Sequence, residues 1–378
     1  MTISLYIHVP FCLQKCRYCD FISYPYSRAA AKDYLAALIR EIQLYGSLLD
    51  EVEKEISSLF IGGGTPTCLP VEDLREILEC IRSVFRLTPH CEITVEANPG
   101  TIDAGALYEL RRTGVNRISI GVQSLTDGLL KTLGRVHNAA QAGAAVRLAR
   151  LAGFDNMNVD LIYGIPGQTL AIWQETLDRT IAFEPEHVAV YGLQLEEGTP
   201  LERSVAIGDM KACPEELELS MYHTAIILLK ESGYHHYEIS NFARPGRECV
   251  HNMVYWLNLP YLGLGPAAHS CLRGERFANE REPEKYRSML RRGELGVADR
   301  EALTMETEMS ETMFLGLRLL QGVHLAAFRQ RFGRRLEDVY RSEIKRLTKD
   351  GLAEIVGDYL RLTERGLPLA NRVFLEFV

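Results

Sequence analysis

The first 200 residues alternate regularly between short apolar runs and amphipathic segments, and this alternation limits the possible folds more than any other feature. Short apolar runs are typical of buried strands, whereas apolar residues at helical spacing indicate helices with one buried face. The pattern predicts strands at 5–9, 58–61, 93–97, 117–122, 157–162 and 188–193. It predicts helices at 31–50, 71–86, 103–113, 138–152 and 169–183.

Strands that alternate with helices form a parallel sheet with the helices packed outside it. The fold class is therefore α/β. Six strands, rather than the eight of a closed barrel, favour an incomplete (β/α)6 barrel that is partly open. A doubly wound open sheet is the alternative that the pattern by itself does not exclude.

Beyond residue 200 the alternation stops. A helix is predicted at 215–232, a strand at 237–242, and an irregular stretch rich in Gly, Pro and aromatic residues at 251–269. From about residue 300 the pattern is helical again, and two short strands near 352–362 and a helix from 363 predict a winged-helix-like unit. The expected domains are a partial barrel over 1–200, a barrel extension over 201–299, and a small, mainly helical C-terminal domain over 300–378.

Charge and cysteine content narrow the classes of function. The chain has 42 basic and 50 acidic side chains and a formal charge of −8, which disfavours a nucleic-acid-binding protein. No apolar run reaches the roughly 20 residues that span a bilayer, and the N-terminus does not resemble a signal peptide. Three of the nine cysteines lie within eight residues, so we expect a metal site and reduced thiols in the cytoplasm.

The strongest motif is formed by Cys12, Cys16 and Cys19, which follow the first predicted strand. Three thiolates this close together on one loop can converge on a single [4Fe–4S] cluster, which ordinarily takes four cysteines. The next positions are Asp20 and Phe21, so one iron would lack a protein sulfur. That iron could bind the amino and carboxylate groups of S-adenosylmethionine (SAM).

A structural zinc site is the alternative for these cysteines. Zinc would take a fourth ligand from a histidine, and His8 and His251 are the candidates. Structural zinc sites usually contain a second pair of closely spaced ligands, which this sequence lacks, so the cluster is favoured.

Polar residues stand at the ends of several predicted strands, where parallel α/β proteins place their ligands. The run GGGTPT follows the second strand, and its glycines would let the backbone approach a ligand. Glu96 and Gln123 end the third and fourth strands, Asp160 lies in the fifth, and Arg135 lies in a loop. Each alone could be a turn residue, a helix cap or a structural hydrogen-bonding group. Their joint placement predicts a pocket.

The motif CxxxCxxC after a first strand resembles the radical SAM superfamily, in which the reduced cluster cleaves SAM to a 5′-deoxyadenosyl radical. From about Leu5 to the C-terminal run LTERGLPLANRVF, the chain also resembles the oxygen-independent coproporphyrinogen oxidase group. The resemblance implies a cluster on Cys12, Cys16 and Cys19. It also implies a SAM site lined by Tyr6, Tyr18, Gly63, Gly64, Thr65, Glu96, Gln123, Arg135 and Asp160.

Two branches of this group differ at positions that the sequence shows. The oxidases carry CxxxCxxCxC and an N-terminal extension, whereas this chain has Phe21 in place of the additional cysteine and only eleven residues before Cys12. The run HNxxYW at 251–256 is typical of the HemW-type haem chaperones. This resemblance implies a haem carrier that passes haem to acceptor proteins such as respiratory proteins, and allows a homodimer; SAM-dependent decarboxylation of coproporphyrinogen is the alternative.

His251 is the candidate haem ligand, because neutral imidazole is a common axial ligand of haem iron. Tyr255 and Trp256 offer flat apolar faces to a macrocycle. The alternative is that these residues are hydrogen-bonded core side chains. The histidine pair at 235–236 and His269 are rival ligands, although neighbouring residues of a strand point to opposite faces.

Overall fold

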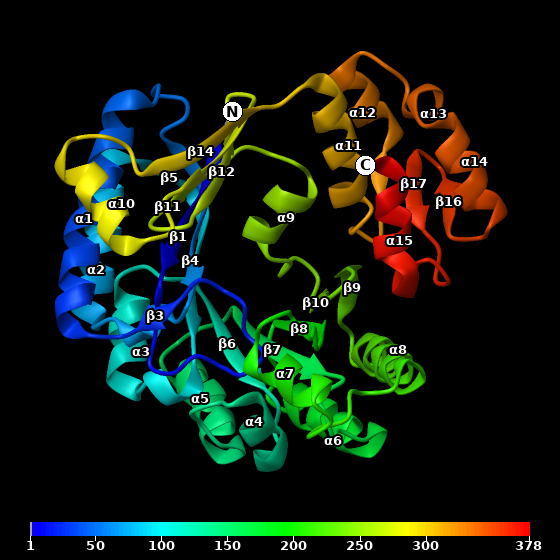
Figure 1. The fold of residues 1–378 in the computed structure, drawn as a ribbon, viewed down its shortest axis with the longest axis horizontal. Helices are drawn as coiled ribbons and strands as arrows, with labels where there is room; N and C mark the ends of the chain where they lie inside the picture. The colour runs from blue at the N-terminus through cyan, green and yellow to red at the C-terminus, as the bar shows by residue number, and fades with distance from the viewer. Residues whose placement is uncertain (1) are drawn as a thin grey trace.

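The computed structural model describes residues 2–378, and one large mixed sheet of twelve strands runs through it (Figure 1). The strand order is β14-β13-β12-β11-β1-β4-β5-β6-β7-β8-β10-β9. Along the chain these strands are β1 (Ile3–Val9), β4 (Glu55–Gly63), β5 (Arg86–Ala97), β6 (Arg117–Gln123), β7 (Met157–Tyr163), β8 (His187–Gly192), β9 (His235–Glu238), β10 (Asn241–Ala243), β11 (Tyr261–Leu264), β12 (His269–Leu272), β13 (Glu275–Asn279) and β14 (Val297–Ala302).

The six predicted strands correspond to β1 and β4 to β8, which pair side by side and in parallel. The α/β fold with an open parallel sheet is therefore confirmed. Each crossover contains a helix, and apolar residues of the strands and helices form one continuous core. The crossover helices are α1 (Arg28–Leu48), α2 (Val71–Val84), α3 (Ala104–Arg112), α4 (Asp127–Leu133), α5 (Ala139–Leu151) and α6 (Leu170–Ile181).

Helix starts are set by local hydrogen bonds that the sequence encodes. The Ser27 hydroxyl accepts a hydrogen bond from the backbone N–H of Ala30 at the start of α1. Asn138 and Gln141 form a reciprocal capping box at the start of α5. In these two crossovers the caps fix where the helix begins after the loop that follows the strand.

The inner face of the open sheet is polar. In a closed (β/α)8 barrel this face is mostly filled by branched apolar side chains. Here Ser58, Glu92 and Arg117, from three neighbouring strands, are buried on it. Glu92 accepts hydrogen bonds from the Cys249 thiol and from the backbone N–H of His251. The segment that carries these two residues therefore packs against the inner face.

Residues 201–299 differ most from the prediction. The single strand predicted at 237–242 is a hairpin, in which β9 and β10 pair antiparallel. The stretch 251–269, predicted to be irregular, contains helix α9 (Val250–Trp256) and strand β11. β11 pairs in parallel with β1, and β12 to β14 extend the sheet antiparallel from it. Long-range pairing forms these short strands, which local periodicity does not reveal. The helices of this region are α7 (Pro200–Ala206), α8 (Glu215–Glu231), α9 and α10 (Pro283–Arg291).

The C-terminal residues surround a separate cluster of buried apolar side chains, on which basis we propose residues 300–378 as a domain. The helix predicted from 363 begins only at residue 370, because a turn at 363–366 and a 3-10 helix at Leu367–Leu369 precede it. Its elements are α11 (Met305–Gly316), β15 (Val323–His324), α12 (Leu325–Phe332), α13 (Leu336–Val339), α14 (Arg341–Lys349), β16 (Ala353–Val356), β17 (Tyr359–Leu362) and α15 (Ala370–Phe374). The three strands form one small sheet.

Within residues 2–378, no helix has both the length and the apolar character needed to cross a bilayer.

Candidate functional site

A cavity of about 530 Å³ opens at the carboxyl ends of the parallel strands. Parallel α/β proteins bind their ligands at this edge. Most of the predicted site residues line it, including all three motif cysteines: Cys12, Cys16, Tyr18, Cys19, Gly63, Gly64, Thr65, Glu96, Gln123, Arg135 and Asp160. Two predicted residues, Tyr6 and His251, are not among the lining residues.

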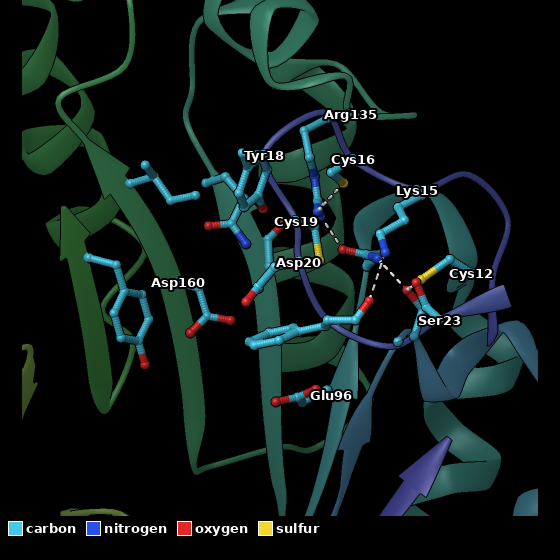
Figure 2. Close-up of a pocket in the computed structure, with 18 of the residues that line it drawn as sticks. Cys12, Lys15, Cys16, Tyr18, Cys19, Asp20, Ser23, Glu96, Arg135 and Asp160 are labelled. Atoms are coloured by element: carbon cyan, nitrogen blue, oxygen red, sulfur yellow. Dashed lines mark hydrogen bonds between the residues drawn. The ribbon is translucent and has the colours of Figure 1, made fainter. Parts of the chain in front are cut away.

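The cysteine loop is tied to the sheet from several sides. Figure 2 shows Cys12, Cys16 and Cys19 above the carboxylates of Glu96 and Asp160. Cys12, at the end of the short strand β2 (Phe11–Cys12), lies with its Sγ 3.6 Å from the hydroxyl of Thr65. Another short strand, β3 (Tyr24–Pro25), pairs with β2 at the other end of the loop. The loop is thus held over the carboxyl edge of the sheet.

Arg135 connects the cysteine loop to the strand ends. One guanidinium nitrogen donates to Cys16 Sγ at 3.3 Å, and the other donates to the backbone carbonyl of Gly121 at 2.8 Å and to Asn98. Arg135 thus places a positive charge beside Cys16. Arg135 therefore belongs to both the cysteine loop and the cavity.

The donor set fits an iron–sulfur cluster better than zinc. Three thiols line one cavity, and thiolates are the preferred ligands of iron–sulfur clusters. Burial raises the pKa of the Cys19 thiol to about 11, and metal coordination would deprotonate it.

Neither His8 nor His251, the two candidates for the fourth ligand of a zinc ion, is available to bind it. The Nε2 of His8 is 3.1 Å from the backbone carbonyl of Ile22, and its Nδ1 is 3.1 Å from the Tyr6 hydroxyl. His251 lies deep in the core, as described below. The same contacts place Tyr6 beneath the cavity, where it supports His8 rather than lining the site.

Two half-buried carboxyl groups give the cavity an acidic inner side. Glu96 accepts a hydrogen bond from the backbone N–H of Gly63 at 3.1 Å, and Asp160 accepts from the Asn158 amide at 2.7 Å. Burial, and then the charge of Asp160, raise the pKa of Glu96 to about 8. Burial also raises the pKa of Asp160. Such a pair favours a ligand with positive charge, because a cation would stabilise both carboxylates.

Unpaired polar atoms indicate that the cavity is shaped for a polar ligand. Across residues 2–378, neither Gln123 Oε1 nor Arg135 Nε has a hydrogen-bond partner, although both are buried. Gln123 also has a positive φ of 65°, which is unusual for a residue other than glycine. The amino, carboxylate and hydroxyl groups of SAM could pair with such atoms, so the residues fit this cofactor.

The glycines of the GGGTPT run are required mainly by the neighbouring strands. A Cβ on Gly63 would lie 2.5 Å from His8 Nδ1, and Gly63 has a φ of +108°. A Cβ on Gly64 would lie 2.5 Å from the backbone oxygen of Phe11. Close approach of β1 and β2 therefore explains these two glycines. Their backbone also borders the cavity.

His251 lies on α9, inside the open sheet, with only 1% of its surface exposed. Its Nδ1 is 2.9 Å from the Ser58 hydroxyl, and its Nε2 is 2.9 Å from the Tyr255 hydroxyl. Its ring also stacks on Phe60, with centroids 5.2 Å apart. In this arrangement neither nitrogen can reach an iron, which favours the alternative of a hydrogen-bonded core histidine. Trp256 is likewise packed, against the guanidinium of Arg318.

Several lining residues were not predicted, notably Asn98, Tyr191 and Gln194. Asn98 follows β5 and donates to the Thr65 hydroxyl at 2.7 Å. Tyr191 is near the end of β8, and Gln194 follows that strand. The strand-end rule used for Glu96 and Gln123 would have found them. Lys15, Asp20, Phe21 and Ser23 of the cysteine loop also line the cavity.

Comparison with known proteins agrees with this geometry. The radical SAM superfamily profile matches residues 6–180, and the HemN C-terminal domain profile matches residues 303–369. Heme chaperone HemW of Bacillus subtilis (strain 168) is 36% identical over 376 residues, which cover 99% of each chain. The chain belongs to the HemW family. HemW of Escherichia coli (strain K12) is 33% identical, over 100% of this chain and 98% of the relative.

The chain is also similar in structure to a solved enzyme. Coproporphyrinogen III oxidase (HemN) from Escherichia coli, a radical SAM enzyme, superposes with a TM-score of 0.87 at 26% sequence identity. The match covers 100% of this chain and 90% of the enzyme. The predicted relationship to the radical SAM superfamily and to the HemW branch is confirmed, and with it the [4Fe–4S] cluster and SAM as the superfamily's cofactors.

Proposed function

We propose that this protein is a radical SAM haem chaperone, which binds a [4Fe–4S] cluster, SAM and haem and transfers haem to acceptor proteins. The observation that carries the proposal is the full-length similarity to proteins named heme chaperone HemW, at 36% identity in Bacillus subtilis. Phe21, which stands where the oxidases have an additional cysteine, supports it.

The residues divide between the two cofactors according to their chemistry. Cys12, Cys16 and Cys19 would hold the cluster, which when reduced supplies an electron to the SAM sulfonium. Glu96 and Asp160 would balance the positive charges of SAM. The remaining lining residues proposed for SAM are Tyr18, Gly63, Gly64, Thr65, Gln123 and Arg135.

An oxygen-independent coproporphyrinogen III oxidase is the second candidate, because HemN has the same fold over the whole chain. An oxidase and a haem carrier differ in what they do with a porphyrin rather than in the cluster site. The proposed partners are haem and haem-accepting respiratory proteins; a homodimer remains a further prediction. We place the protein in the cytoplasm because its nine cysteines, all free, suit a reducing compartment.

The cofactor site is tested by anaerobic reconstitution with iron and sulfide. We expect about four irons per chain in the wild type and loss of the cluster in Cys16→Ala, because one thiolate of three is removed. Cys213→Ala, outside the cavity, is the matched control and should keep the cluster. SAM should alter the EPR spectrum of the reduced cluster, and Glu96→Ala should weaken SAM binding. Zinc without a brown chromophore would contradict the cluster.

The choice between carrier and oxidase is tested with two substrates. Reconstituted protein receives SAM, a reductant and coproporphyrinogen in one experiment, and haem alone in another. We expect no protoporphyrinogen and about one haem bound per chain, followed by transfer to an apo-haemoprotein. Turnover of coproporphyrinogen would overturn the carrier assignment even if haem also bound.

A further inference from the structure

A haem ligand must present a ring nitrogen to the outside, and half of the ten histidines cannot. Five are buried, with between 1% and 8% of their surface exposed: His8, His137, His187, His236 and His251. Two others have one ring nitrogen in a polar contact: the Nδ1 of His235 faces the carboxylate of Glu248, and the Nδ1 of His324 accepts a hydrogen bond at the start of α12. The remaining three, His90, His223 and His269, are exposed.

His269 lies on the open face of the sheet extension. The cross-strand pairs are Tyr261 with Cys271, Cys271 with Arg276, and His269 with Ala278. Because side chains alternate along strands, these five residues share one face. That face is partly open: His269 is exposed and the other four are half-buried. On the opposite face Ser270, Leu272 and Phe277 are buried.

The open face adjoins the cysteine loop. A Cβ on Gly263 of β11 would lie 2.1 Å from the backbone oxygen of His269, and Gly263 pairs with Tyr6 of β1, two residues before His8. His8 in turn contacts the backbone of Ile22, and the Tyr24 hydroxyl donates to the backbone carbonyl of Arg281 at 3.2 Å. A ligand on this face would therefore sit beside the loop that carries the cluster.

Two arginines lie at or beside this face. Arg276 is held by Glu311 of α11, and Arg281 is exposed and makes no ion pair within residues 2–378. Burial, and then the charges of Arg281 and Arg276, lower the pKa of His269. This region thus offers the groups that could bind an iron macrocycle with two carboxylates: an imidazole for the iron, an aromatic ring at Tyr261 and two guanidinium groups for the carboxylates.

The other two accessible histidines lack this combination. His90 precedes Cys91 near the amino end of β5, whereas the cavity lies at the carboxyl ends of the strands. His223 lies on the exposed side of α8 between Leu219 and Ile227, so a macrocycle there would rest on a single helix. His223 is therefore the better control, since its imidazole is exposed and flanked by apolar residues.

We propose that His269 is an axial ligand of haem, bound on the open face of β11 to β13 beside the cysteine loop, with its propionates paired to Arg276 and Arg281. This site rests on the proposed haem-carrier function. It replaces His251 as the haem ligand and puts haem and cluster on adjacent parts of the same edge.

Haem titration of the full-length, reconstituted protein tests the ligand. We expect His269→Ala to weaken haem binding by about tenfold or more and to shift the Soret band, because an axial ligand is lost. His223→Ala should bind haem within about twofold of the wild type. His269→Gln is a second variant, and iron content reports correct folding in each case.

The charge arrangement is tested with haem and with haem dimethyl ester, which lacks carboxylates. Arg281→Glu should weaken haem binding several-fold and ester binding much less. If the wild type binds no haem, the proposed function fails. If the wild type binds haem but both His269 variants retain its affinity and Soret band, only the proposed site is overturned. If Arg281→Glu weakens the binding of haem and of its ester equally, the proposed contact between Arg281 and a propionate is overturned.

Discussion

Glu96 is a half-buried carboxyl group whose pKa lies well above its ordinary value. Its pKa of about 8, against an ordinary 4.5, means that the folded chain holds a proton that the unfolded chain releases. The resulting stabilisation is complete below the ordinary pKa and is lost as the pH rises through about 8. Between about pH 6.5 and 8, we expect the unfolding free energy of the cofactor-free protein to fall about 1–2 kcal/mol further than that of Glu96→Gln. Urea unfolding at each pH measures this, and parallel curves would contradict it.

Gly63 is the residue at which the strand end leaves no space for a side chain. In Gly63→Ala the new Cβ would meet the His8 ring at 2.5–2.6 Å, on a backbone with φ of +108°. We expect a loss of about 2 kcal/mol or more in unfolding free energy and weaker SAM binding. Gly128→Ala is the control, because nothing lies within 4 Å of its added Cβ and helix α4 accommodates alanine. Equal stability of the two variants in urea would argue against the steric role.

At the scale of elements, helix α9 fills the inner face of the open sheet, and His251 fastens it there. His251→Ala would leave the Ser58 and Tyr255 hydroxyls with one hydrogen bond fewer and open a cavity. We expect a loss of about 2–4 kcal/mol in unfolding free energy, with the Soret band of bound haem unchanged in the folded fraction. Far-UV circular dichroism in urea and a haem spectrum measure both effects. Loss of the haem band at undiminished stability would instead make His251 a ligand.

At the largest scale, several polar contacts join the C-terminal residues to the rest of the chain, and one of them is a salt bridge. Glu311 of α11 is 3% exposed and pairs with Arg276 of β13. Glu311→Gln should cost about 2–3 kcal/mol, because the guanidinium loses its counter-charge in a partly buried place, and should separate thermal unfolding into two transitions. Calorimetry checks this against Glu337→Gln, whose partner Arg335 is exposed and which should change stability by less than about 0.5 kcal/mol. A single transition in both variants would contradict the expectation.

The sequence by itself determined the features that depend on neighbouring residues. Apolar periodicity predicted β1 and β4 to β8 with all their crossover helices except α4, and the cysteine spacing predicted the cluster loop. The rule that ligands lie at strand ends brought Glu96, Gln123 and Asp160 together, because parallel strands carry their ends to one edge.

The tertiary structure decided the features that depend on pairing between distant segments. β11 lies beside β1, and the hydrogen bond from His251 to Ser58 joins residues 193 positions apart. The sequence showed a histidine in HNxxYW but not its burial, and it showed His269 only as a rival ligand. Which imidazole remains accessible is set by what packs against it, and a local pattern carries no information about contacts made by the far end of the chain.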